Sequence, residues 1–419
     1  MRKLKKLTRS SARSLREHPP SRRARPSLKL APQAPCASSL PWLAKDAANA
    51  ITLRQQFLTS ARHETAASTV LLQAGALHSS RFSSAAIALA ARTNTPAAAA
   101  LTETYLSPSA IRLRCMRGTL HLVNTDMAPA YHKATLRQRM ATCAYLCHRV
   151  GLDRRTLAEL RDLILLTLSG TPSSSLQLEH AIARRREVVD RRHIRYTLRI
   201  LWEEGTLAAL FSGSQWNKEA RQYDLLHRHY PNLDLNQIAE EDADRIVVRA
   251  YFAAYGPSTE QDAAWWTGLS MLRLRRAIAA IHTDFRRVCV DNIELPCLVS
   301  VEALDCRPLQ SIPCTRLLPL EDNLLKGYSV SRARFFKNSV NLRRATNAAG
   351  EAKPLILDDG AIVGTWRCQN GSDFETELFG ANSPQFARRL EFEVERLEEL
   401  GILGQSLPRE RSLLICGGD

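Results

Sequence analysis

The middle of the chain repeats one pattern of helices and strands. Residues 151–230 have the apolar spacing of three helices, the third expected over His193–Glu204, followed by two strand-like runs on either side of a polar tip. The pattern recurs over residues 242–301. Three short helices followed by a two-stranded hairpin is the winged form of the helix-turn-helix. Residues 49–125 offer three helical stretches and then strands, so we expect three tandem winged-helix units in a mainly α fold with β (α+β).

This pattern predicts five parts. We expect a disordered basic tail over residues 1–48, winged-helix units over 49–150, 151–233 and 234–303, and a β-rich C-terminal part with a terminal helix over 304–419.

Two helix starts carry cap signals. Thr156, with Glu159 three residues later, has the spacing of a capping box and is expected to begin a helix that runs to Leu168. Ser258 is expected to cap a helix over Thr259–Trp266.

The positive charge indicates a polyanionic partner. The chain has 58 Lys+Arg against 42 Asp+Glu, a formal net charge of +16. Residues 1–30 hold eleven of these bases and one acid, so about +6 remains for the other 389 residues. The tail is rich in Ser and Pro, and it fits a solvated or mistakenly included segment, a nucleic-acid-binding arm or a targeting segment. No run of 18 apolar residues occurs, so no membrane span is expected.

Arginines gather on or near the third helix of each repeated unit. Guanidinium groups match phosphate oxygens with paired hydrogen bonds, so these clusters predict contact with DNA. Acidic neighbours such as Glu187 and Glu204 leave open a solvated, charge-balanced surface, and winged helices also bind proteins. We expect duplex DNA as the partner of a monomer, with no membrane and no small-molecule cofactor. The candidates are Arg184, Arg185, Arg186, Arg191, Arg192 and Arg195 in the second unit and Arg273, Arg275, Arg276, Arg286 and Arg287 in the third.

The cysteines give little sign of metal chemistry. No Cys-x-x-Cys pair occurs, so no structural zinc site is expected. Cys143, Cys147 and His148 are close in sequence, but small core residues on a helix explain them better than a metal site does. The thiols spread over residues 297–314 favour a reducing compartment, so a cytoplasmic, nucleoid-associated protein is expected.

Four segments resemble the AlkZ-like winged-helix DNA glycosylases. They are Arg117–Val123, Tyr251–Asp262, Leu317–Leu325 and Val363–Arg367, in the family's order, and the resemblance spans roughly residues 50–400. It implies a C-shaped array of three winged helices that cups duplex DNA. It also implies a monofunctional enzyme that hydrolyses the N-glycosidic bond of alkylated purines, including bulky or crosslinked adducts in some members, without a metal or organic cofactor.

The resemblance also points to a catalytic motif. The family carries Gln-x-Gln, or variants such as Gln-x-Asp and His-x-Gln, just after a short glycine-led stretch. The matching positions here are His78 and Ser80, after Gly75-Ala76-Leu77. The serine departs from the family pattern, so His78 is expected to act as a neutral general base with Ser80 as a water-anchoring donor. The alternatives are that Ser80 or Ser83 only caps the next helix, and that the protein is a catalytically inactive DNA-binding or regulatory member.

The remaining candidates flank this motif or lie in the other matching segments. Arg81, Arg117 and His121 are expected to face DNA, although the last two could serve packing or backbone bonds instead. Asp322 is expected to cap or pin a turn rather than to react. Three tryptophans at helical and strand positions are expected mainly in the core, namely Trp265, Trp266 and Trp366.

Overall fold

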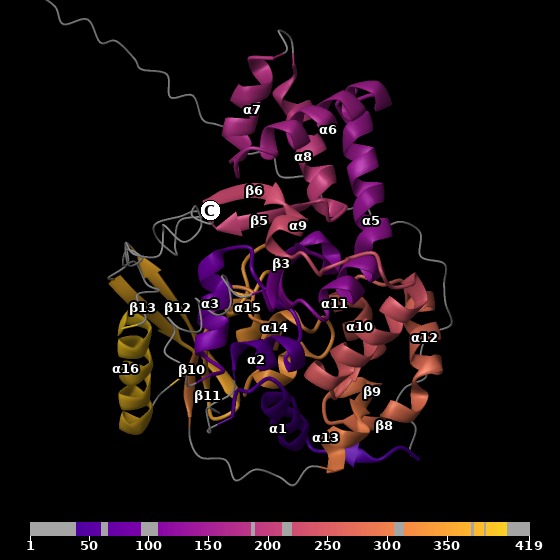
Figure 1. Cartoon of the computed structure of the whole chain (residues 1–419). Coiled ribbons are helices and arrows are strands. Elements are labelled where there is room, and N and C mark those ends of the chain that lie inside the picture. Colours follow the sequence, from indigo (N-terminus) through magenta and orange to yellow (C-terminus); the bar gives the residue numbers. More distant parts are fainter. Residues whose placement is uncertain are drawn as a thin grey trace, which may run out of the picture. The chain divides into compact units, whose positions relative to one another are not determined.

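The computed structural model describes most of the chain after its N-terminal segment. The described residues are 39–59, 66–93, 108–185, 189–211, 220–305, 314–369, 373–380 and 383–399. Helices and short sheets alternate through these ranges, so the predicted mainly helical α+β fold is confirmed (Figure 1). The basic segment over residues 1–30, the tip residues 212–219 and Arg186 lie outside the described residues. No described helix combines the length and apolar character that crossing a bilayer requires.

A three-stranded sheet carries the predicted motif. After β1 (Trp42–Leu43) and α1 (Lys45–Gln55), the chain forms α2 (Ala67–Gln73), β2 (Leu77–His78), α3 (Phe82–Ala90), β3 (Ala110–Arg114), the 3-10 turn η1 (Met116–Gly118) and β4 (Leu120–Asn124). Strands β2 and β3 both pair antiparallel with β4, which lies between them. His78 is therefore the direct cross-strand partner of His121. The three helical stretches predicted within residues 49–125 correspond to α1, α2 and α3.

The second repeat has the predicted three helices and hairpin. They are α6 (Arg154–Leu168), α7 (Ser175–Ala183), α8 (Arg191–Glu203), β5 (Leu207–Phe211) and β6 (Arg221–Leu225), followed by α9 (Leu226–His229). The predicted Thr156 cap is wrong: Asp153 caps α6, and its carboxylate accepts from the Thr156 backbone N–H at 2.8 Å. An ionised carboxylate three residues earlier is the better acceptor for that N–H. Apolar faces of α6 and α8, including Leu160 and Leu198, form the core of this repeat.

The third repeat packs against the long helix α5 (Ala128–Arg149), and its sheet includes the N-terminal strand β1. Its elements are α10 (Glu240–Tyr255), β7 (Ser258–Thr259), α11 (Glu260–Thr267), α12 (Met271–Ala280), η2 (His282–Asp284), β8 (Phe285–Val290), β9 (Ile293–Ser300) and α13 (Val301–Asp305). The strand order is β1-β8-β9-β7. The predicted Ser258 cap is wrong, because Ser258 pairs with β9 and Thr259 caps α11 in a reciprocal capping box with Asp262.

The C-terminal part is a four-stranded antiparallel sheet with one covering helix. It contains β10 (Thr315–Leu318), α14 (Asn323–Lys326), η3 (Arg332–Phe335), α15 (Asn341–Arg344), β11 (Leu355–Asp358), β12 (Ala361–Gln369), β13 (Asp373–Leu378) and α16 (Pro384–Glu399). Phe386 and Leu397 of α16 are buried in the same cluster as Trp366. The indole N–H of Trp366 donates to the Leu318 carbonyl at 2.9 Å, so its predicted core position is confirmed.

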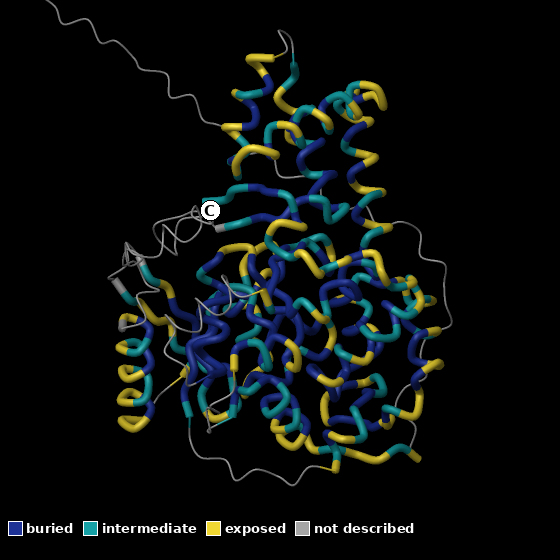
Figure 2. Tube along the Cα trace, viewed as in Figure 1, coloured by how far each residue is buried: buried dark blue, intermediate teal, exposed yellow. Residues whose placement is uncertain are grey.

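One helix contributes to two apolar cores. Helix α5 (Ala128–Arg149) places Tyr131 in the core built around α10 and Cys143 and Cys147 in the core of the second repeat. Burial of these thiols confirms the prediction that they are core residues, whereas His148 is exposed. The inward side of α10 is fully buried, as the dark segments of Figure 2 show. Because α5 belongs to both cores, the exact domain boundaries remain a prediction.

Candidate active site and DNA interface

Contacts from two distant segments hold the stretch that leads into the strand carrying the motif. Gly75 ends α2 with φ of +79°, a conformation that favours glycine, and turns the chain into β2. The Asn323 side chain donates to the Ala76 carbonyl at 3.0 Å, and the Gln56 side chain donates to the Ala74 carbonyl at 3.2 Å. The position of His78 is therefore set by residues from α1 and α14 as well as by its own sheet.

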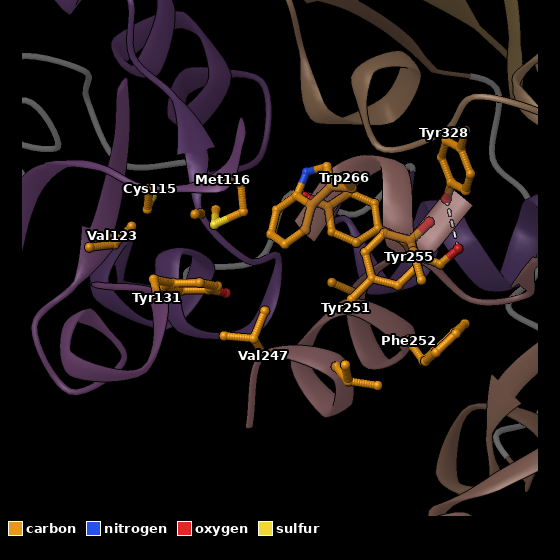
Figure 3. Close-up of a cluster of buried hydrophobic side chains, with 14 of the residues drawn as sticks. Cys115, Met116, Val123, Tyr131, Val247, Tyr251, Phe252, Tyr255, Trp266 and Tyr328 are labelled. Atoms are coloured by element: carbon orange, nitrogen blue, oxygen red, sulfur yellow. Dashed lines mark hydrogen bonds between the residues drawn. The ribbon is translucent and has the colours of Figure 1, made fainter. Parts of the chain in front are cut away.

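The rings of His78 and His121 pack in a T-shaped, edge-to-face arrangement beside a buried tryptophan. Their ring centroids are 5.7 Å apart at an interplanar angle of 79°. His121 lies edge-on to Trp266 at 6.4 Å, and Figure 3 shows this tryptophan among Tyr131 and Tyr255. His121 is 1% exposed and His78 is 7% exposed. Because the His121 ring is buried, it cannot contact DNA in this structure, and the prediction that it faces DNA is wrong. The prediction that Trp266 is a core residue is confirmed.

Burial keeps both histidines uncharged. Desolvation, followed by the nearby ammonium of Lys326, lowers the pKa of His78 to about 2. The same two causes lower the pKa of His121 to about 3. An imidazole with so low a pKa is a weak base, so the expectation that His78 takes a proton near neutral pH is corrected. Its Nδ1 atom is buried without a hydrogen-bond partner among the described residues, which leaves a polar atom free to hold a ligand or a water.

Arg112 fixes the loop between His78 and the next helix. Its guanidinium donates to the Ser79 carbonyl from Nε at 2.9 Å and from Nη2 at 2.6 Å, and to the Ser80 carbonyl at 3.1 Å. The same guanidinium lies 3.9 Å from the centre of the Phe82 ring. Helix α3 begins after Arg81 without any side-chain cap, so the alternative that Ser80 or Ser83 serves as its cap is wrong. Ser80 and Arg81 are exposed beside the buried His78.

Two residues in left-handed backbone conformations flank the histidine pair. Arg117 has φ of 54°, and its guanidinium lies 3.4 Å from the centre of the Trp265 ring, which is 37% exposed. Glu321 has φ of 59° and forms an ion pair with the largely buried Lys326. Side chains other than glycine rarely adopt this conformation, and it tends to occur where function requires it. Sequence analysis identified Arg117 but missed Glu321 and Lys326. The only signal for Glu321 was its place in the Leu317–Leu325 segment, which ends one residue before Lys326.

The predicted DNA-contacting arginines fall into two groups. Several are bound to carboxylates: Arg195 donates to Glu179 at 2.6 Å, Arg273 donates to Asp244 at 2.5 Å and Arg275 donates to Glu260 at 2.9 Å. These three arginines therefore have carboxylate partners within the fold, which they help to stabilise. The candidates that are exposed and form no ion pair with another described residue are Arg81, Arg184, Arg185, Arg191, Arg276 and Arg286.

The buried histidines predict a stability that falls in mild acid. Besides His78 and His121, burial lowers the pKa of His132 to about 3. The unfolded chain binds these protons near pH 6.5 and the folded chain does not, so each histidine weakens folding as pH drops through the range from about 6.5 to 3. We expect the free energy of unfolding to fall by up to about 1.4 kcal/mol per pH unit for each histidine.

Urea denaturation at about pH 7 and about pH 5 measures this effect. His132→Gln should reduce the pH dependence, and His148→Gln, at an exposed position on α5, should leave it unchanged. A free energy of unfolding that is the same at both pH values would contradict the buried, neutral state of these rings.

Comparison with known proteins identifies the family. A family model described as DNA glycosylase AlkZ-like matches residues 67–400. The chain belongs to the AlkZ-like DNA glycosylase family. The solved structure of Streptomyces sahachiroi DNA glycosylase AlkZ matches with a TM-score of 0.65 at 21% identity, covering 86% of this chain and 97% of that chain, which shows a common fold. No curated protein matches this chain.

Membership of the AlkZ-like family confirms the predicted resemblance. The matched range begins at α2 and includes the histidine pair, Arg112 and α14. A DNA glycosylase acts on DNA, so DNA is the partner of this chain and an inactive regulatory member is not the favoured alternative.

Proposed function

We propose that the protein hydrolyses the N-glycosidic bond of alkylated purines in duplex DNA, with His78 and Ser80 at the reacting centre. The observation that carries this proposal is the position of the matching motif in an AlkZ-like chain. His78 is held on a short strand with an unpartnered, buried Nδ1, and the exposed Ser80 lies two residues away. We further propose that the protein works as a monomer without a metal or an organic cofactor.

This hydrolysis requires little acid–base catalysis from the enzyme. Alkylation at a ring nitrogen makes the purine cationic and therefore a good leaving group. What remains is to stabilise an oxocarbenium-like sugar and to orient one water for attack. A neutral imidazole offers one hydrogen-bond donor and one acceptor, as a glutamine amide does, so burial gives His78 the character of the family's usual residue. The Ser80 hydroxyl is shorter and anchors the water from the exposed side.

Arg112 serves this arrangement as a positioning residue. Its three hydrogen bonds to the Ser79 and Ser80 carbonyls hold the loop at a fixed distance from β3. Water orientation depends on distances of a few tenths of an ångström, so a loose loop would lower the rate without changing the chemistry.

DNA binding is expected to depend on the exposed arginines. Arg276→Gln should lower the slope of log affinity against log salt by about 0.9, because it removes one phosphate contact. Arg273→Gln, on the same helix α12, should instead lower the free energy of unfolding, because it leaves the buried carboxylate of Asp244 without its partner. Binding titrations across a salt series, with thermal melts of both variants, measure these effects. Equal salt slopes for Arg276→Gln and the unaltered protein would remove Arg276 from the interface.

Base release from a duplex containing N7-methylguanine tests the proposed activity. The expected result is free N7-methylguanine and an abasic site, with no release from the unmodified duplex. The proposal would be contradicted if the protein bound duplexes containing N7-methylguanine or other alkylated purines tightly but released none of these bases. That result would favour a non-catalytic DNA-binding protein.

A further inference from the structure

An exposed tryptophan lies on the helix that packs against the histidine pair. Trp265 is 37% exposed, so the prediction that it is a core residue is wrong. The adjacent Trp266 is 2% exposed and packs edge-on to His121 at 6.4 Å. Successive residues of an α-helix point about 100° apart around its axis. Helix α11 therefore directs Trp266 toward the histidines and Trp265 to the surface beside them.

Contacts from two elements hold an arginine against this tryptophan. The Arg117 guanidinium lies 3.4 Å from the centre of the Trp265 ring, which is van der Waals contact with the face of the indole. Arg117 is itself exposed, and its turn η1 leads into the strand that carries His121. Gly268 ends α11 with φ of +75°, and a Cβ atom there would lie 3.3 Å from the Arg117 backbone nitrogen. The end of α11 thus lies directly against η1, which fixes the two side chains relative to each other.

We infer that Arg117 and Trp265 form a stacking platform for a DNA base, namely the undamaged base that stands opposite the alkylated purine. Aromatic rings and guanidinium planes both bind bases by stacking once a base has left the duplex stack. Excision of the purine leaves the opposite base without a pairing partner. The inference rests on the proposed function only for placing the reacting centre at His78, next to this platform.

The charge of Arg117 decides which base the platform accepts. Burial is the main cause that lowers the pKa of His78 and of His121, and the Arg117 guanidinium is one of the charges that lower both further. Its positive charge therefore reaches the reacting centre. A purine alkylated at a ring nitrogen is cationic and is repelled by it, whereas a cation is attracted to the π face of an uncharged base. The opposite base is uncharged and stays in the DNA after excision, so the platform should bind the abasic product as well as the damaged duplex.

The experiment uses a stable abasic analogue, so it does not depend on base release. A tetrahydrofuran residue replaces one nucleotide of a duplex, and 2-aminopurine, whose fluorescence is quenched by stacking, stands opposite it. The affinity of the full chain is measured for this duplex and for the same duplex with a complete base pair. The expected results are tighter binding to the analogue duplex and weaker 2-aminopurine emission with the unaltered protein than with Trp265→Ala.

Variants separate stacking from charge and from folding. Trp265→Ala should lose roughly tenfold in affinity for the analogue duplex and little for the complete one, because only the first offers an unpaired base. Trp265→Phe should retain part of the preference. Trp42→Ala, at a 59% exposed tryptophan of β1, should retain all of it. Arg117→Lys keeps the charge without the plane, so it should weaken the preference and leave the salt dependence of binding unchanged.

Four results would overturn the inference. They are equal affinity of the unaltered protein for both duplexes, an unchanged preference in Trp265→Ala, an equal loss on both duplexes in a Trp265→Ala protein that still melts cooperatively, and an equal loss in Trp42→Ala. Base release from the N7-methylguanine duplex is measured in parallel. If no base is released while the preference for the analogue duplex depends on Trp265, the proposed hydrolysis fails and the platform stands.

Discussion

Replacing Asp322 with alanine is expected to lower the free energy of unfolding by about 3–5 kcal/mol. Asp322 and Arg92 are both fully buried, and the guanidinium donates to the two carboxylate oxygens at 2.8 and 2.9 Å. The substitution leaves the arginine charge in the interior without its partner. It also removes the cap of α14, where Asp322 accepts from the Leu324 N–H at 2.9 Å. The predicted structural role of Asp322 is confirmed.

Urea denaturation measures this loss against a matched surface pair. Glu377 pairs with Arg344 at 3.0 Å, and both side chains are at least 40% exposed. Glu377→Ala should cost less than about 1 kcal/mol, because water solvates the remaining arginine. If the two variants lose equal stability, the Asp322–Arg92 pair is not buried as described.

Replacing His78 with alanine is expected to lower the rate of base release by roughly a hundredfold or more, the usual cost of losing one well-placed hydrogen-bonding group at a reacting centre. His78→Gln should retain most of the rate, because the neutral imidazole acts here as a hydrogen-bonding group and not as a proton acceptor. For the same reason the rate should show no inflection near pH 6.5. An inflection there, with inactive His78→Gln, would restore the role of general base.

The fold could be predicted where local sequence decides it. Apolar periodicity predicted α8 and the strands β5 and β6, and the β-rich C-terminal part with a terminal helix appears as β10 to β13 and α16. The caps at Thr156 and Ser258 were misplaced because a neighbouring residue, Asp153 or Thr259, is the better-placed acceptor.

The site could be predicted only in part. The family motif pointed to His78 and Ser80 and a neutral His78 was expected, but the sequence did not show that burial would make this imidazole a weak base. The groups that decide its chemistry come from segments far along the chain: Asn323 lies 247 positions after Ala76, whose carbonyl it holds. Pairing between distant residues also explains why some arginines were wrongly expected to be free for DNA. Arg273 is an example, because its guanidinium binds the carboxylate of Asp244, 29 positions away in the sequence.

Single-turnover release of N7-methylguanine by His78→Ala tests the central claim most directly. The matched control is His148→Ala, which removes an exposed histidine far from the motif in sequence. The account predicts that the unaltered protein and His148→Ala release the base at similar rates and that His78→Ala, still folded and still binding DNA, is slower by roughly a hundredfold. Equal rates for His78→Ala and the unaltered protein would show that the reacting centre lies elsewhere.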